Sequence, residues 1–302
     1  MRIEIGTSSS LIWSKKVSIM VAVSLSSALC LVGVGASFCV ATLHVPRHVG
    51  APPPNAADVD VVANDKVRLK AWWLRPAKPN GNCVIVLHGI ADSRSSSVGF
   101  APMFLRQGYA VLVPDSRAHG KSGGEFVTYG LLEKYDAVVW AHWMKSEGCH
   151  KIYGLGESLG ASVLIQAAAV EPIFAAIVAE CPYADLREIA EYRMRQFVRL
   201  PGFIAAPVAR VVVASGMLYA YFVERLDFRQ VSPVKSIART LTPILLIHGL
   251  DDFRTPPAQS QELAAANPGD PLWLVPKANH TGASTAAPDE FPRRVSSWFA
   301  KH

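Results

Sequence analysis

Short apolar runs alternate with amphipathic segments along most of the chain after Asp58. A short, continuous apolar run is typical of a strand that is covered on both faces. The amphipathic segments repeat their apolar positions at helical spacing, so one face of each can pack on a core. Together these patterns predict an α/β fold with a mostly parallel sheet and helices on both faces. The expected strands are Val67–Leu74, Cys83–Leu87, Ala110–Pro114, Lys151–Leu155, Phe174–Glu180, Pro243–His248 and Leu272–Pro276, and the expected helices are Tyr129–Lys145, Ser158–Val170 and Asp289–Lys301.

Residues 184–236 interrupt this alternation, because they contain apolar helical segments and no clear strand. We expect them to form a helical cap inserted into the domain. Within them Gly202–Val223 is nearly all apolar, with Arg210 as its only charge, so a second membrane-spanning or membrane-dipping helix is the alternative. Arg210 and Pro207 favour the cap, because a charge at the centre of a span costs at least about 2.5 kcal/mol on insertion scales.

A long apolar segment, Val17–Leu43, lies near the N-terminus and contains no charged residue. A helix of this length measures about 40 Å, enough to cross a hydrocarbon core of about 30 Å. Lys15 and Lys16 precede it, and such flanking charges tend to stay cytoplasmic. We therefore expect a cytoplasmic segment 1–16, a single-pass anchor 17–43, a proline-rich linker 44–57 and an extracytoplasmic domain 58–302. The alternative is a signal peptide that is cleaved to release a secreted protein, although the apolar region of such peptides is usually about 7–15 residues long.

Composition excludes several other classes of protein. Half of the residues are hydrophobic and 18% are charged, which excludes global disorder and allows a large core. The formal net charge is +6, but the basic residues are spread along the chain and no nucleic-acid-binding module is present. We expect no nucleic-acid partner and a solvated basic surface, with attraction to an anionic membrane as the alternative.

The five cysteines have no spacing typical of a metal site, so we expect no metal. Cys30 and Cys39 lie in the apolar N-terminal segment. Cys83, Cys149 and Cys181 each lie beside an expected strand, where buried free thiols are the favoured interpretation. A Cys83–Cys149 disulfide is the alternative.

The motif with the clearest chemistry is Gly156-Glu157-Ser158-Leu159-Gly160, which follows an apolar strand and opens a small-residue helix. A nucleophilic serine must project from a tight turn between strand and helix, and the flanking glycines Gly156 and Gly160 leave room for that turn. An ordinary glycine-rich turn is the alternative. The strand–turn–helix context favours the nucleophile.

A serine nucleophile needs a base, and the base needs an orienting acid. Asp252 follows the strand Pro243–His248, and His280 follows the last expected strand. Loops after parallel strands meet at one edge of a sheet, which is where ligands bind in open α/β folds. The sequence therefore predicts a Ser158–His280–Asp252 triad, with Asp251 as the alternative acid and His248 as a supporting residue of its loop.

The turn His88-Gly89-Ile90 ends an earlier buried strand at the same edge. Gly89 permits close approach of the backbone, and His88 supports the turn. The backbone N–H groups of Ile90 and Leu159 are the candidate oxyanion hole.

These residues resemble the α/β-hydrolase superfamily, and in particular its Bem46-like or ABHD-like serine hydrolases, related to serine aminopeptidases and monoacylglycerol lipases. The resemblance covers about Val67 to His302 and is carried by four stretches. It implies an eight-stranded, mostly parallel sheet and hydrolysis of esters, thioesters or amides. Many relatives have glycine where this chain has Ala118, which should fit if the backbone there is not left-handed. Haloalkane dehalogenases and epoxide hydrolases resemble the fold but have aspartate at the turn. The four stretches are Val86–Gly89, Pro114–Ser122, Gly156–Gly160, and His248–Asp252 with His280.

The combined expectation is a membrane-anchored carboxylesterase or lipase that needs no cofactor. Its apolar anchor and cap favour a small-molecule ester or lipid as substrate. A non-catalytic binding protein is the alternative from another class, because a fold alone never proves activity. An acyltransferase or a peptidase would use the same triad.

Overall fold

The computed structural model describes residues 8–198 and 201–302, and its centre is a single eight-stranded sheet. The strand order is β1-β2-β4-β3-β5-β6-β7-β8. The first two pairings, β1 with β2 and β2 with β4, are antiparallel, and the others are parallel. The predicted eight-stranded, mostly parallel sheet is therefore confirmed. The strands are β1 (Ala57–Val62), β2 (Arg68–Leu74), β3 (Cys83–Leu87), β4 (Ala110–Pro114), β5 (Ile152–Glu157), β6 (Ala176–Glu180), β7 (Ile244–Gly249) and β8 (Leu272–Val275).

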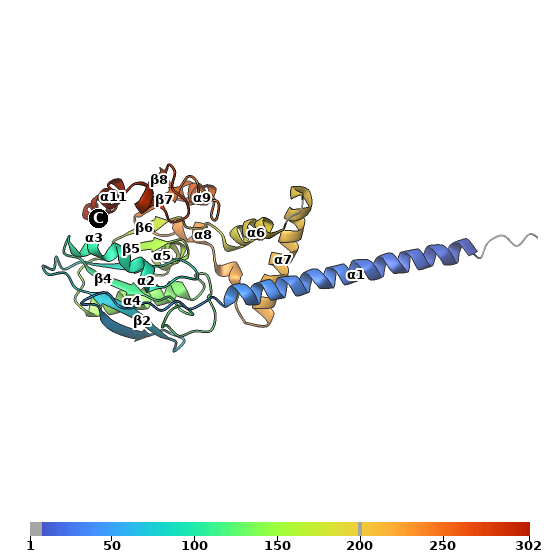
Figure 1. The fold of residues 1–302 in the computed structure, drawn as a ribbon, viewed down its shortest axis with the longest axis horizontal. Helices are drawn as coiled ribbons and strands as arrows, with labels where there is room; N and C mark the ends of the chain where they lie inside the picture. The colour runs from blue at the N-terminus through green and yellow to red at the C-terminus, as the bar shows by residue number, and fades with distance from the viewer. Residues whose placement is uncertain (1–7, 199–200) are drawn as a thin grey trace, which may run out of the picture.

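Helices cover both faces of the sheet and bury two separate apolar layers (Figure 1). One layer is closed by α4 (Glu133–Ser146), α5 (Leu159–Val170), α8 (Pro233–Ile237) and α9 (Ala258–Ala266). The other is closed by α3 (Ala101–Leu105) and α11 (Glu290–Lys301). Two further four-residue helices, α2 (Arg94–Ser97) and α10 (Ala283–Ala286), lie in the loops after β3 and β8.

Two predicted boundaries at the N-terminal half of the domain need correction. The first strand, β1, begins at Ala57, the last residue of the predicted linker, and was not expected, because Asp58 and Asp60 interrupt its apolar pattern at the exposed edge of the sheet. The helix expected from Tyr129 begins only at Glu133. Tyr129 has a left-handed φ of 52°, and the Glu133 carboxylate accepts hydrogen bonds from the N–H groups of Thr128 and Gly130, which hold the preceding residues in a turn.

The N-terminal helix α1 (Ser8–Leu43) extends from the body of the domain, and α7 (Gly202–Phe222) packs across it (Figure 1). Gly35 and Gly216 allow the two backbones to approach closely. A Cβ on Gly35 would lie 2.5 Å from the Val212 carbonyl oxygen, and one on Gly216 would lie 2.8 Å from the Gly35 carbonyl oxygen. The remaining cap helix, α6 (Leu186–Phe197), packs on α7.

Among the residues that the structure describes, one helix, Gly202–Phe222, is both long and apolar enough to span a bilayer. One third of its apolar window is buried against the rest of the protein. Its exposed side chains include Phe203, Leu218 and Phe222.

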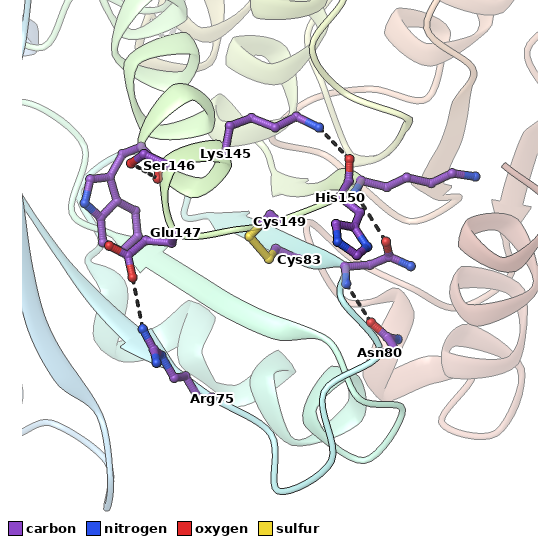
Figure 2. Close-up of a disulfide and its surroundings, with 11 residues drawn as sticks. Arg75, Asn80, Cys83, Lys145, Ser146, Glu147, Cys149 and His150 are labelled. Atoms are coloured by element: carbon purple, nitrogen blue, oxygen red, sulfur yellow. Dashed lines mark hydrogen bonds and ion pairs between the residues drawn. A yellow bond between two sulfur atoms is a disulfide. The ribbon is translucent and has the colours of Figure 1, made fainter.

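Cys83 and Cys149 form a disulfide, so the favoured prediction of free thiols is wrong for this pair (Figure 2). Cys83 begins β3, and Cys149 lies in the loop that leads from α4 into the neighbouring strand β5. Because β3 and β5 pair directly, their starting points are adjacent, with the two cysteine Cα atoms 5.7 Å apart. Cys181 is buried and free, as predicted.

Candidate active site

Ser158 lies in the turn between β5 and α5, at the carboxyl edge of the sheet. Its φ of 52° and ψ of −111° are strained for any residue except glycine, as expected of a nucleophile held in a sharp turn. Gly156 and Gly160 make the turn sterically feasible. A Cβ on Gly156 would lie 2.5 Å from the Gly160 carbonyl carbon, and one on Gly160 would collide with the carbonyl of Leu87.

The imidazole of His280 lies between the other two predicted triad residues. Its Nε2 is 2.9 Å from the Ser158 hydroxyl oxygen, and its Nδ1 is 2.7 Å from Asp252 Oδ2. Since an ionised carboxylate only accepts hydrogen bonds, Nδ1 carries the ring proton and donates a hydrogen bond to Asp252. Nε2 is then free to accept the hydroxyl proton of Ser158, which is the arrangement a general base requires.

The structure brings Asp252, and not Asp251, to His280. Asp251 is exposed, whereas Asp252 is buried and also accepts hydrogen bonds from the N–H groups of Arg254 and Thr255. Burial alone would raise the pKa of Asp252. The hydrogen bonds from His248, His280 and Thr255 outweigh burial and hold this pKa well below its usual value. The carboxylate therefore stays ionised and can stabilise a protonated His280.

His248 supports the acid loop, as expected. Its Nε2–H donates to the Thr255 carbonyl oxygen at 2.7 Å and lies 3.3 Å from Asp252 Oδ2, while its Nδ1 accepts from the Ser260 hydroxyl. In the described part of the chain, Cys181, His248 and Asp252 are the group close enough together to ligate a metal. Both ring nitrogens of His248 are already hydrogen-bonded, so these residues are better explained as a support for His280.

Two buried histidines brace the turn that carries the candidate oxyanion donor Ile90. His88 Nε2 accepts from the Ser116 N–H, so its Nδ1–H donates to the Gly89 carbonyl oxygen. His119 Nε2 accepts from the Ala91 N–H, at 3.1 Å. Burial lowers the pKa of both rings, to about 4 for His88, which keeps them neutral and able to accept these bonds.

Ile90 and Leu159 line the same cavity as Ser158 and His280. Within residues 8–198 and 201–302, neither of the two backbone N–H groups donates a hydrogen bond to the protein. Leu159 is the first residue of α5, where backbone N–H groups have no partner inside the helix and favour negative charge. Both donors are therefore available to a substrate oxygen.

Ala118 does not meet the condition under which it was expected to fit without strain. Its φ is 58°, in the left-handed region, where an alanine carries a steric cost that glycine avoids. The surrounding turn is closed by bonds from the Ala118 N–H to the Gly123 carbonyl and from the His119 N–H to the Ser116 carbonyl. These bonds hold the alanine in this conformation.

Sequence reasoning missed a pair of carboxyls, Glu157 and Glu180, behind the nucleophile. They occupy paired positions on β5 and β6, and the Glu180 carbonyl accepts the N–H of Ser158. Burial and then the charge of Glu180 raise the pKa of Glu157 to about 8, and burial is the main cause that raises the pKa of Glu180 to about 7. Only the strand register could have revealed this pair, because the two residues are distant in the sequence.

The sequence also did not predict a second buried network, which is centred on Arg117. The buried Arg117 guanidinium donates to Asp136 Oδ1 at 2.6 Å and to Asp65 Oδ2 at 2.7 Å. Burial raises the pKa of Asp136 to about 6, because desolvation outweighs the opposing effect of Arg117. The network connects the turn that contains His119 to α4, so it supports the site indirectly.

The triad opens into a cavity of about 430 Å³, a size typical of small-molecule sites. Ser158, His280, Ile90 and Leu159 are at one part of its lining, and the cap and α1 supply most of the rest. The apolar part of the lining includes Phe38, Leu43, Ile189, Phe197, Met217 and Phe228.

Comparisons with known proteins show the family to which this chain belongs. A model of the alpha/beta hydrolase family matches residues 84–295, which include the nucleophile turn and both other triad positions. The chain belongs to the α/β-hydrolase family. Among solved structures, this hydrolase is similar to the esterase Pf2001 of Pyrococcus furiosus, with 27% identity, a TM-score of 0.69, and 85% and 99% of the two chains covered.

Two curated relatives match over shorter regions. The hydrolase is 30% identical to the uncharacterized protein YqkD of Bacillus subtilis over 209 residues, which are 68% of this chain and 66% of that protein. It is 29% identical to the quorum-quenching protein AidA of Acinetobacter baumannii over 140 residues, 44% of this chain and 46% of that one. The matched region thus spans just under two thirds of the first relative and about half of the second.

Proposed function

We propose that this α/β-hydrolase is a serine hydrolase that cleaves carboxylic esters, and that it belongs to the Bem46-like branch of the family. The observation that carries the proposal is the unbroken chain of contacts from the Ser158 hydroxyl through His280 to Asp252. Similarity to the Pyrococcus esterase and the free N–H groups at the site support the same chemistry.

Each residue has a separate task in the proposed reaction. Ser158 Oγ attacks the ester carbonyl carbon while its proton passes to His280 Nε2, and Asp252 stabilises the imidazolium that forms. The Ile90 and Leu159 N–H groups bind the oxyanion of the tetrahedral intermediate, where one donor is typically worth about 10²–10³-fold in rate. His280 returns the proton to the departing alcohol. Water, activated by the same imidazole, then releases the carboxylic acid and regenerates Ser158.

Hydrolysis by the purified Ser158→Ala variant tests the proposal. Loss of the nucleophile should lower kcat by about 10⁶-fold, because the remaining residues cannot form an acyl-enzyme. Thermal unfolding of both proteins controls for folding. Full activity in the variant would contradict the role of Ser158, and a wild-type protein that turns over no ester would favour a ligand-binding role.

The proposal includes the location of the enzyme. The apolar segment 17–43 forms a single-pass anchor whose last turns leave the bilayer and dock on the domain. Residues 44–57 act as a spacer, and the domain 58–302, with its cap at about 184–236, lies on the extracytoplasmic side. Two observations support this: α1 is one continuous helix over the apolar segment, and disulfides persist mainly in oxidising compartments. Protease added to intact cells should degrade the domain, and protection of the domain would contradict this orientation.

A further inference from the structure

The end of α1 does more than connect the domain to the segment before it, because it lines the cavity at Ser158. Phe38, Cys39, Thr42 and Leu43 all contribute to that lining. Leu43 is almost completely buried, with 1% of its surface exposed. A helix that served only as a tether would have no reason to share a cavity with the nucleophile.

Specific contacts fix α1 in this position. The Tyr129 hydroxyl donates to the Thr42 carbonyl oxygen at 2.7 Å, and the Val127 N–H donates to the Leu43 carbonyl oxygen at 3.0 Å. Tyr129 also lines the cavity, so the contact lies at the site itself. Further along α1, the close approach of Gly35 to Val212 and Ser215 of α7 leaves little freedom for the helix to slide or rotate.

The rest of the wall is mostly apolar and comes largely from the cap, and its two charged residues are Arg193 of α6 and Arg254. Val213, Gly216 and Met217 of α7 and Leu186, Ile189 and Phe197 of α6 face the same cavity as the α1 residues. The candidate reacting groups lie together at Ser158 and His280, and the walls beyond them offer few polar partners. Such a site suits a ligand that has one reactive carbonyl and a long hydrocarbon chain.

We propose that residues 38–43 of α1 are a specificity-determining wall of the active site, and that the substrate is an ester with a long acyl chain that lies between α1 and the cap. This inference rests on the proposed serine hydrolase function, and it adds the class of substrate. Each methylene group that the walls bury should raise kcat/KM about fourfold until the cavity is filled. An acyl chain of twelve carbons or more should therefore be preferred strongly to acetyl.

The test uses the full-length protein in detergent micelles and a series of p-nitrophenyl esters from acetate to palmitate. Thr42→Trp places a bulky ring in the cavity while keeping the backbone carbonyl that Tyr129 contacts. The ratio of kcat/KM for laurate to that for acetate should fall at least tenfold relative to wild type. Phe38→Ala, which enlarges the cavity, should move the preferred chain length upward by two or more carbons.

Val40→Trp is the matched control. Val40 lies on the same turns of α1 but is exposed and does not line the cavity, so the chain-length profile should stay as in wild type. Circular dichroism and thermal unfolding identify any variant that is misfolded. The inference is overturned if folded Thr42→Trp and Phe38→Ala both keep the wild-type profile, or if Val40→Trp changes it as strongly.

The outcomes separate this inference from the proposed function. A wild-type enzyme that hydrolyses esters through Ser158 with no preference for long chains would overturn the wall alone. A wild-type protein that hydrolyses none of the esters would overturn both.

Discussion

At the residue scale, Asp252 is the group whose charge sets the tautomer of the proposed base. Asp252→Asn should lower kcat by about 10⁴-fold, because an amide can donate to His280 Nδ1 and so place the ring proton on Nε2, where it blocks the Ser158 hydroxyl. Asp251→Asn is the matched control, since Asp251 is exposed and adjacent in the chain. Steady-state rates of the two variants on one ester give the comparison. A larger loss for Asp251→Asn would assign the acid to Asp251.

Glu157 should make the protein less stable in alkaline solution. Its pKa is raised from 4.5 to about 8 in the folded protein, so the folded state binds its proton more tightly than the unfolded state. The resulting stabilisation is complete below about pH 4.5 and is lost as the pH rises through about 8. Glu157→Gln should therefore raise the unfolding temperature more at pH 9 than at pH 5.

Glu125→Gln provides the control for that measurement, because Glu125 is an exposed carboxyl that lies outside the sheet. Its effect on the unfolding temperature should be the same at both pH values. An equal effect of Glu157→Gln at pH 5 and pH 9 would show that Glu157 is not protonated in the folded protein.

The convergence of Ser158, Asp252 and His280 could be predicted because their order and their positions after strands are visible in the sequence. Ser158, Asp252 and His280 each follow an apolar run, and parallel strands end at one edge. Glu180 also ends an apolar strand, but nothing in the sequence indicates a partner for it. Only the register of β5 against β6 places it beside Glu157.

At the element scale, the Cys83–Cys149 disulfide joins the start of β3 to the loop before β5 (Figure 2). The bridge closes a loop with a sequence separation of 66 residues, so removing it should lower the free energy of unfolding by about 2–4 kcal/mol. Urea unfolding of the double variant Cys83→Ser/Cys149→Ser measures the loss. The same loss should follow when wild type is treated with dithiothreitol.

Cys30→Ser controls for the general effect of removing a thiol, because Cys30 is exposed on α1. It should leave the stability unchanged in urea. Wild-type protein that keeps its stability after reduction would argue that the bridge contributes nothing to the fold.

The strands that the sequence predicted well are those buried on both faces. β3, β4 and β7 appear as unbroken apolar runs, and their ends shift by at most one residue. The element that was missed, β1, is an edge strand in which four of the six residues are exposed. Likewise, the helix predicted from Tyr129 begins only at Glu133, because Tyr129 has a left-handed backbone and the Glu133 carboxylate holds the N–H groups of Thr128 and Gly130 in a turn.

At the scale of the whole molecule, the site is completed by two segments far apart in the sequence. The topology of the sheet could be predicted from the family resemblance, which extends over the main domain. The contact of α1 with α7 could not, because both segments are apolar over their length and neither pattern specifies a partner. Gly35 and Gly216 permit the close crossing, and their role becomes clear only when the helices are placed together.

The cap helix α7 and the N-terminal helix α1 are both apolar over most of their length. Both helices expose apolar side chains, among them Val32, Val34 and Val40 on α1 and Phe203, Leu218 and Phe222 on α7. Exposed apolar side chains are found where a protein contacts lipid or another protein, so they fit the anchor that we propose.

The central claim is that Ser158 is the nucleophile of the enzyme, and mass spectrometry after treatment with a fluorophosphonate probe tests it most directly. If Ser158 is the nucleophile, we expect one covalent phosphonyl adduct per chain, on the peptide that contains Ser158. No adduct should form in Ser158→Ala or in heat-denatured protein. A folded, ester-hydrolysing protein that carries the adduct on a different residue, or that is labelled equally well as Ser158→Ala, would contradict it.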